Sequence, residues 1–141
     1  MAQVPVAEGI FTFPSDAPQL IGSRCNGCGI VTFPAQASCP RCASTDMAEQ
    51  LLSREGRLWA WTTQDFPPPP PYNGPSGKDF VPFGVGFVEL SGEIKVESHL
   101  TVSDPAALEI GMAMELVLVP FRTNDDGDEV MTFAFAPVGG K

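Results

Sequence analysis

Hydrophobic and polar residues alternate along the second half of the chain in the way that predicts β-strands. Between the third and fourth strands, Asp104 is a good N-cap and Pro105 fits the first position of a short helical stretch. Such a connection is typical of an OB-fold, and five short strands favour a small closed barrel because closure removes unpaired edges. The five predicted strands are 56–63, 83–90, 94–100, 112–119 and 130–136.

The strand at 56–63 carries both tryptophans of the chain. Strict alternation predicts that Leu58 and Ala60 share one face. The opposite face then carries Arg57, Trp59 and Trp61. An aromatic pair beside an arginine suits stacking on nucleic-acid bases. We favour burial of the pair against the neighbouring module or a partner subunit, which makes Trp59 and Trp61 candidate docking residues.

A proline-rich segment, residues 66–78, separates the first two strands. Its five consecutive prolines lack backbone N–H donors and favour a stiff, extended polyproline conformation. Long loops in compact domains often carry function, and polyproline is itself a form that partners recognise. We therefore expect a partner or substrate contact here, with Pro69 and Tyr72 as docking residues. A plain spacer is the alternative.

The first fifty residues contain two short predicted strands, 19–25 and 30–34, and all four cysteines of the chain. The cysteines form two close pairs, Cys25-Asn-Gly-Cys28 and Cys39-Pro-Arg-Cys42. Two intervening residues let a tight turn aim both sulfurs of a pair at one ion, so the spacing predicts a tetrahedral structural Zn²⁺ site. Gly27 and Gly29 flank Cys28, where such a turn often needs a positive φ.

Other uses of the cysteines fit the pattern less well. Two disulfides would require an oxidising compartment, and the N-terminus lacks the order of a secretion signal. A thioredoxin-like redox pair would need a free dithiol, which two pairs at this spacing do not leave. Iron bound by the same four sulfurs is an alternative that the sequence leaves open. A module of this size buries too small a core, so the metal is expected to supply the missing stability.

The net charge is -9 and the sequence pI is about 4.3. Nucleic-acid binding depends on clustered Lys and Arg, whereas the eight basic residues here are scattered among seventeen acidic ones. No stretch approaches the length of a membrane span. We therefore expect a cytoplasmic protein that binds neither nucleic acid nor membrane.

The chain offers few side chains suited to acid–base or nucleophilic catalysis, and we assign no catalytic residue. Its one histidine, His99, falls on the polar side of a predicted strand and is expected to be exposed rather than a base. All cysteines are committed to the metal, and a closed Cys₄ site has no open position at which to activate water.

The order of these motifs resembles a known family. The residues that carry the resemblance are Cys25–Gly29, Phe33-Pro34, Cys39–Cys42, Ser53–Thr63 and Pro82–Leu90. The family comprises acyl-CoA-associated proteins built from a rubredoxin-like zinc ribbon and an OB-fold, and the likeness covers nearly the whole chain. The predicted fold class is mostly β, with the zinc ribbon and a short lead-in in residues 1–50 and a five-stranded OB-fold barrel in residues 51–141.

The resemblance implies an accessory, non-catalytic subunit of a thiolase-fold complex that processes acyl-CoA. The implied partner is a thiolase-like or lipid-transfer-protein-like catalytic subunit. The implied reaction of the complex is a retro-aldol carbon–carbon cleavage of steroid side chains. On charge alone, the residues assigned to the coenzyme A phosphates are Arg24, Arg41, Arg54 and Lys78. A ribbon–OB nucleic-acid-binding module is the second hypothesis, and an autonomous acyl-CoA enzyme is the third.

Overall fold

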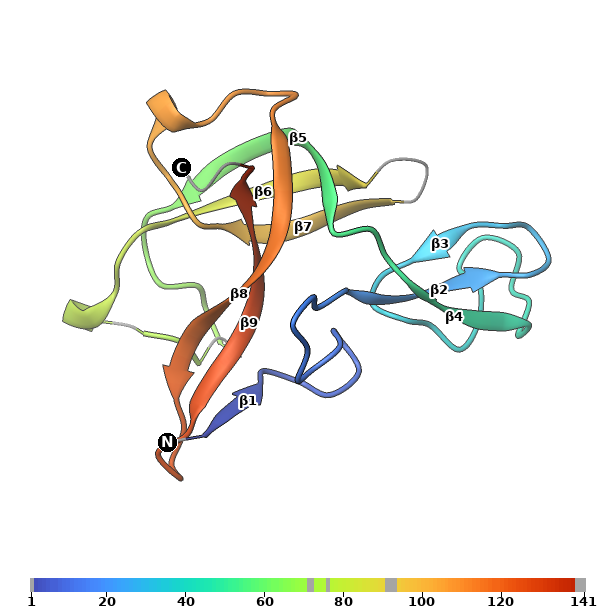
Figure 1. Ribbon diagram of the computed structural model, residues 1–141, viewed down its shortest axis with the longest axis horizontal. Coiled ribbons are helices and arrows are strands. Elements are labelled where there is room, and N and C mark those ends of the chain that lie inside the picture. The colour runs from blue at the N-terminus through green and yellow to red at the C-terminus, as the bar shows by residue number, and fades with distance from the viewer. Residues whose placement is uncertain (1, 71–72, 76, 91–93, 139–141) are drawn as a thin grey trace.

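The strands form two sheets of different size, which lie at opposite ends of the computed structural model (Figure 1). The structure describes residues 2–70, 73–75, 77–90 and 94–138. The smaller sheet holds β2 (Ile21–Cys25), β3 (Val31–Thr32) and β4 (Met47–Leu51). The larger sheet holds β1 (Gln3–Pro5), β5 (Glu55–Gln64), β6 (Phe83–Leu90), β7 (Ile94–Leu100), β8 (Ala113–Thr123) and β9 (Glu129–Pro137). Two short 3₁₀ turns are η1 (Gly77–Asp79) and η2 (Pro105–Ala107).

The larger sheet closes into the predicted five-stranded barrel. Strands β5, β6, β7, β9 and β8 pair in that order, and β8 pairs again with β5. The closing pair β7–β9 is parallel and short, with His99 opposite Ala134 and Leu100 opposite Phe135. Inside the barrel, six side chains are at most 1% exposed, namely Leu58, Val88, Leu90, Met114, Leu116 and Phe135. The OB-fold prediction is therefore confirmed, and Asp104 caps η2 by accepting a hydrogen bond from the Ala106 N–H at 2.9 Å.

A β-bulge in β5 overturns the predicted faces of that strand. Leu58 lies opposite Val88 and Ala60 lies opposite Phe87, so Trp59 is the extra residue that has no partner across the pair. Beyond the bulge, Trp61 lies opposite the buried Gly86. Directly opposed residues share a face. Trp61 therefore faces inward and packs against the core, whereas Trp59 faces outward and is 52% exposed.

Two strands were absent from the sequence-based prediction. The edge strand β4 is mostly exposed, and its hydrophobic and polar residues do not alternate. Its sequence therefore gave no signal of its pairing with β2. Strand β1 is three residues long and pairs in parallel with β9. Beside it, Asp128 in the β8–β9 turn accepts a hydrogen bond from the Ala2 N–H, and Glu129 at the start of β9 accepts one from the Gln3 side-chain amide. The predicted division places β1 in the N-terminal module, yet β1 joins the sheet of the barrel. The domain division at residue 50 stays a prediction.

Backbone and side-chain contacts join the ribbon to the barrel. Arg54, at the junction, donates from Nε to the Pro18 carbonyl at 2.9 Å and from Nη2 to the Leu116 carbonyl at 3.0 Å. The Phe33 ring, just after β3, meets the Phe133 ring of β9 edge-on at 5.6 Å between centroids. The core side chains of both modules form one continuous apolar cluster. These contacts hold the ribbon in one orientation on the barrel.

Candidate metal centre

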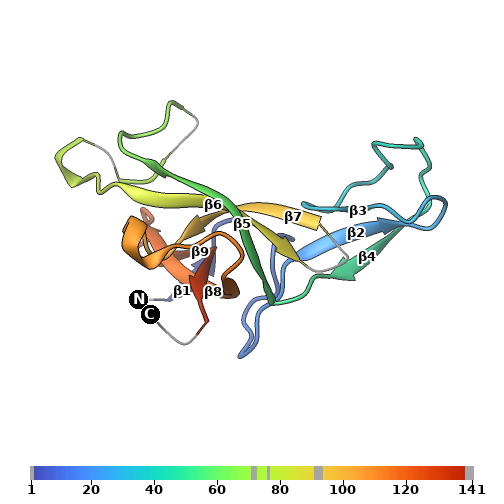
Figure 2. The same ribbon diagram turned by 90° about the horizontal axis from the view of Figure 1, so that it is seen from above.

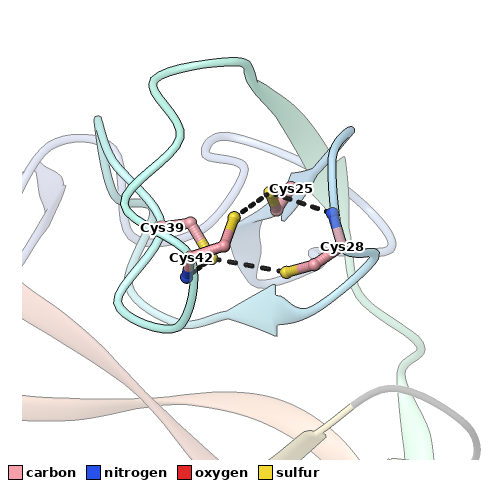
Figure 3. A group of neighbouring side chains, drawn as sticks. All are labelled: Cys25, Cys28, Cys39 and Cys42. Carbon is pink, nitrogen blue, oxygen red and sulfur yellow. Dashed lines mark hydrogen bonds between the residues drawn. The ribbon is translucent and has the colours of Figure 1, made fainter.

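Two equivalent turns bring the four cysteines together at the far end of the ribbon (Figure 3). The first turn follows β2, and its Gly29 N–H donates to the Cys25 carbonyl at 2.8 Å. The second turn repeats this bond, from the Ala43 N–H to the Cys39 carbonyl at 2.9 Å. Backbone N–H groups also point at the sulfurs, since the Cys28 N–H donates to Cys25 Sγ and the Cys42 N–H to Cys39 Sγ.

The sulfur positions fit one tetrahedral ion. All four Sγ atoms lie within 4.8 Å of one another, with Cys25 3.6 Å from Cys42 and Cys28 3.5 Å from Cys39. Metal–sulfur bonds of about 2.3 Å in a tetrahedron require sulfur–sulfur separations of roughly 3.8 Å. A disulfide needs about 2.05 Å. The cysteines are therefore positioned as ligands of a single metal ion and not as disulfide partners.

The ionisation of the four thiols explains why a bound cation stabilises this cluster. The Cys28 N–H lowers the pKa of Cys25 to about 6. The Ser44 N–H favours the Cys42 thiolate, but the neighbouring Cys25 and Cys39 sulfurs outweigh it and raise the pKa of Cys42 to about 12. Four thiolates this close repel one another, and a bound dication removes that penalty.

The residue after each turn adopts a left-handed backbone conformation. In the first turn this residue is Gly29, with φ at +83°, as predicted, whereas Gly27 is not among the positive-φ residues. In the second turn the same place is taken by Ala43, with φ at 63°. A Cβ at such a φ clashes with the backbone, so Ala43 carries strain that Gly29 avoids.

Replacing Ala43 with glycine is expected to stabilise the metal-loaded ribbon by about 1 kcal/mol, because glycine takes this conformation without the Cβ clash. Transfer of the metal to a competing chelator, followed over time, measures the effect as slower loss. Ala48→Gly, in the extended strand β4, is the matched control and is expected to speed the loss. Equal rates for A43G and the wild type would contradict the strain at Ala43.

The structure does not bring together the four residues assigned to coenzyme A phosphates. Arg24 in β2 and Arg41 in the second turn are both exposed on the ribbon. Lys78 lies in η1, at the opposite end of the molecule in both views (Figures 1 and 2). Arg54 uses two of its donors within the chain, as described above. The coenzyme A assignment stays a prediction.

The four predicted docking residues are also separated. Trp59 and Trp61 lie on opposite faces of β5, because the bulge intervenes. Pro69 is exposed in the loop between β5 and β6. Tyr72 lies outside the described residues. Their role in docking stays a prediction.

Sequence reasoning missed an aromatic cluster around His99. This residue was expected to be exposed, yet its ring stacks on Phe83 at 4.3 Å and meets the Phe121 ring edge-on at 6.3 Å. Burial lowers the pKa of His99, so the imidazole is neutral near pH 7. The cluster lines a groove of about 370 Å³ on the barrel. The alternating apolar side chains at 83, 85 and 87 were the available signal.

No helix within the described ranges is long and apolar enough to cross a membrane.

Two family models match consecutive parts of the chain. The model described as the rubredoxin-like zinc ribbon domain of ChsH2 matches residues 16–48. The model described as the C-terminal OB-fold domain of ChsH2 matches residues 49–119. The first match contains all four cysteines, and the geometry of their sulfurs agrees with a zinc site.

Individual proteins show the same likeness. A DUF35 domain-containing scaffold protein of Methanothermobacter thermautotrophicus is 32% identical, over 82% of this chain and 83% of its own length. The benzoylsuccinyl-CoA thiolase subunit BbsA of Thauera aromatica is 27% identical, over 89% of this chain and 82% of its own. Among solved structures, an Ltp2-ChsH2(DUF35) aldolase matches with a TM-score of 0.60 and 24% identity, covering 84% of both chains. That last likeness supports the fold alone.

Proposed function

The chain belongs to the ChsH2 family of zinc-ribbon and OB-fold proteins, and we propose that it is an accessory subunit of a thiolase-fold complex that processes acyl-CoA. The observation that carries the proposal is the similarity, over most of both chains, to a thiolase subunit and to scaffold proteins. A scaffold binds and orients other chains and leaves the chemistry to them.

The site chemistry supports a structural role for the metal. All four tetrahedral positions are filled by cysteine sulfurs, so a zinc ion held there has no open position for water or substrate. Within the described residues, these cysteines are the only group of three or more His, Cys, Asp or Glu side chains placed to share an ion. The ion would hold the two turns together, and the ribbon would then present a rigid surface to the partner.

The finer part of the proposal concerns the reaction of the partner. We propose retro-aldol cleavage of a steroid side-chain acyl-CoA, with coenzyme A phosphates contacted by Arg24 and Arg41 because both are exposed on the ribbon. The nucleic-acid alternative is weakened, because the bulge puts Trp59 and Trp61 on opposite faces and the chain carries a net charge of -9.

Co-purification from the source cells tests the proposal. The tagged chain is expected to recover a thiolase-fold chain in fixed stoichiometry, and the recovered chain should lose solubility or activity without its small subunit. Nucleic acid retained at moderate salt in place of such a chain, or acyl-CoA turnover by the small subunit alone, would contradict the proposal.

Two substrates then separate the possible reactions. A retro-aldol lyase cleaves a 3-hydroxyacyl-CoA with no added coenzyme A. A thiolase cleaves a 3-oxoacyl-CoA and needs free coenzyme A as the acceptor. Cleavage of only the 3-oxo substrate would leave the accessory role intact and overturn the retro-aldol part.

A further inference from the structure

The outward side of β6 is apolar, although it faces away from the barrel core. Its inward positions are buried, as the burial pattern of the strand shows. Its outward positions include Phe83, Val85 and Phe87, of which Phe87 is 39% exposed. A sheet with one solvated face normally alternates hydrophobic with polar residues. A strand that is apolar on both sides is typical of a sheet that is covered on both faces.

Aromatic residues of the neighbouring strands extend this surface. On one side, the exposed Trp59 ring meets Phe87 edge-on at 6.2 Å, and Lys95 Nζ lies 4.7 Å from the centre of the Trp59 ring. On the other side, His99 stacks on Phe83. We call Trp59, Phe83, Val85, Phe87 and His99 the aromatic face. It lies on the β5–β6–β7 layer, opposite the layer of β1, β8 and β9 (Figure 2).

Charged residues border the aromatic face at one end. Arg57 lies opposite Glu89, which lies opposite Lys95, so one row across the three strands alternates in sign. The next row contains Phe87 opposite Glu97. A centre poor in charge with a charged rim is the composition of a protein–protein interface.

A groove beside the aromatic face offers a place for an anchoring side chain. It has a volume of about 370 Å³, and its walls include Phe83, His99, Phe121 and Phe133. Interface hot spots are typically apolar or aromatic side chains that insert into such pockets. The aromatic face and the groove share Phe83 and His99, so a single partner surface can cover both.

We infer that the aromatic face is the docking surface for the catalytic subunit, whose own surface has an apolar centre, a rim with charges of both signs to match Arg57, Glu89 and Lys95, and a side chain that inserts into the groove. The inference rests on the proposed function. The net charge of -9 favours a basic partner and disfavours a second copy of this acidic chain. The exposed Arg24 and Arg41 belong to the ribbon, whereas the aromatic face belongs to barrel strands β5, β6 and β7, so this surface is separate from the proposed coenzyme A contact.

Two variants test the aromatic face in the purified complex. Phe87→Glu is expected to raise the Kd for the catalytic subunit roughly 30-fold or more, because a second carboxylate beside Glu97 replaces an apolar ring that the partner would cover. Val6→Glu is the matched control, since Val6 is also 39% exposed but follows β1 on the other layer. The control is expected to change the Kd by less than about threefold. Trp59→Ala provides a second variant if F87E fails to fold.

Hydroxyl-radical footprinting gives an independent readout on the wild-type chain. Trp59 is expected to be readily oxidised in the free subunit and protected in the complex. Equal effects of F87E and V6E, or a Trp59 that stays reactive in the complex, would overturn the inference while leaving the accessory role standing. Concentration-dependent protection of Trp59 in the free chain would assign the face to a second copy and also overturn it. Failure to recover a thiolase-fold chain is a separate result, which contradicts the proposed function.

Discussion

Replacing Cys39 with serine is expected to abolish tight metal binding and to unfold the ribbon. Cys39 is 3% exposed, and its sulfur accepts hydrogen bonds from the Arg41 and Cys42 N–H groups. Structural zinc sites contribute about 10–16 kcal/mol of apparent binding free energy, which is also folding free energy for so small a module. Serine supplies no thiolate, so most of this contribution is lost. Metal content by atomic emission and the NMR spectrum of residues 20–52 measure the two effects.

The control for this variant lies in the same turn. Ser44→Ala removes a hydroxyl that accepts from the Asp46 N–H at 3.1 Å, but it removes no sulfur. Its metal content is expected to equal that of the wild type. A C39S protein that retained one tightly bound ion and a folded ribbon would contradict the four-cysteine site.

Acid is expected to release the metal for the same reason. In the metal-free ribbon the pKa of Cys25 is lowered from 9.0 to about 6. A lowered pKa stabilises the folded state above the unfolded value, and this contribution is lost as the pH falls through 6. Protonation of the Cys25 sulfur takes one ligand from the ion, so chelator extraction should be faster at pH 5 than at pH 8.

Replacing Phe135 with alanine is expected to cost about 3–5 kcal/mol of unfolding free energy, because the ring is 0% exposed and leaves a cavity in the barrel. The cavity would lie next to the β7–β9 pair, which is the shortest strand pairing of the barrel. Phe135 is one of only two residues of β9 paired with β7, and its carbonyl accepts the Thr101 N–H at 3.0 Å. Thermal unfolding of the metal-loaded protein should show a Tm lower by roughly 10–20 °C.

Phe87→Ala is the matched control for the barrel. It removes the same ring from an outward, 39% exposed position, where the main loss is the edge-on contact with Trp59. Its expected cost is about 1 kcal/mol. Similar losses for F135A and F87A would mean that the barrel interior does not supply the stability assigned to it.

Local patterns in the chain were enough to predict the metal site and the strands of the barrel. The two cysteine pairs place their ligands through tight turns, whose geometry depends on neighbouring residues alone. The five barrel strands have the alternation or apolar runs that burial of one face imposes. The Asp104 cap and the positive φ of Gly29 are likewise local, and both were predicted.

Long-range pairing decided the rest. Whether Trp59 and Trp61 share a face depends on one extra residue opposite Val88 and Phe87, and nothing within β5 marks that position. Strands β1 and β4 form because β9 and β2 offer them hydrogen-bonding edges, not because of their own composition. His99 is half-buried, and one of the rings packed against it is Phe121 of β8, a strand more than ten residues further along the chain. The sequence by itself therefore determined the modules and the ligands of the metal, since these depend on short-range spacing. Only the tertiary structure decided which side chains form the aromatic face, because that depends on the register between strands far apart in the chain.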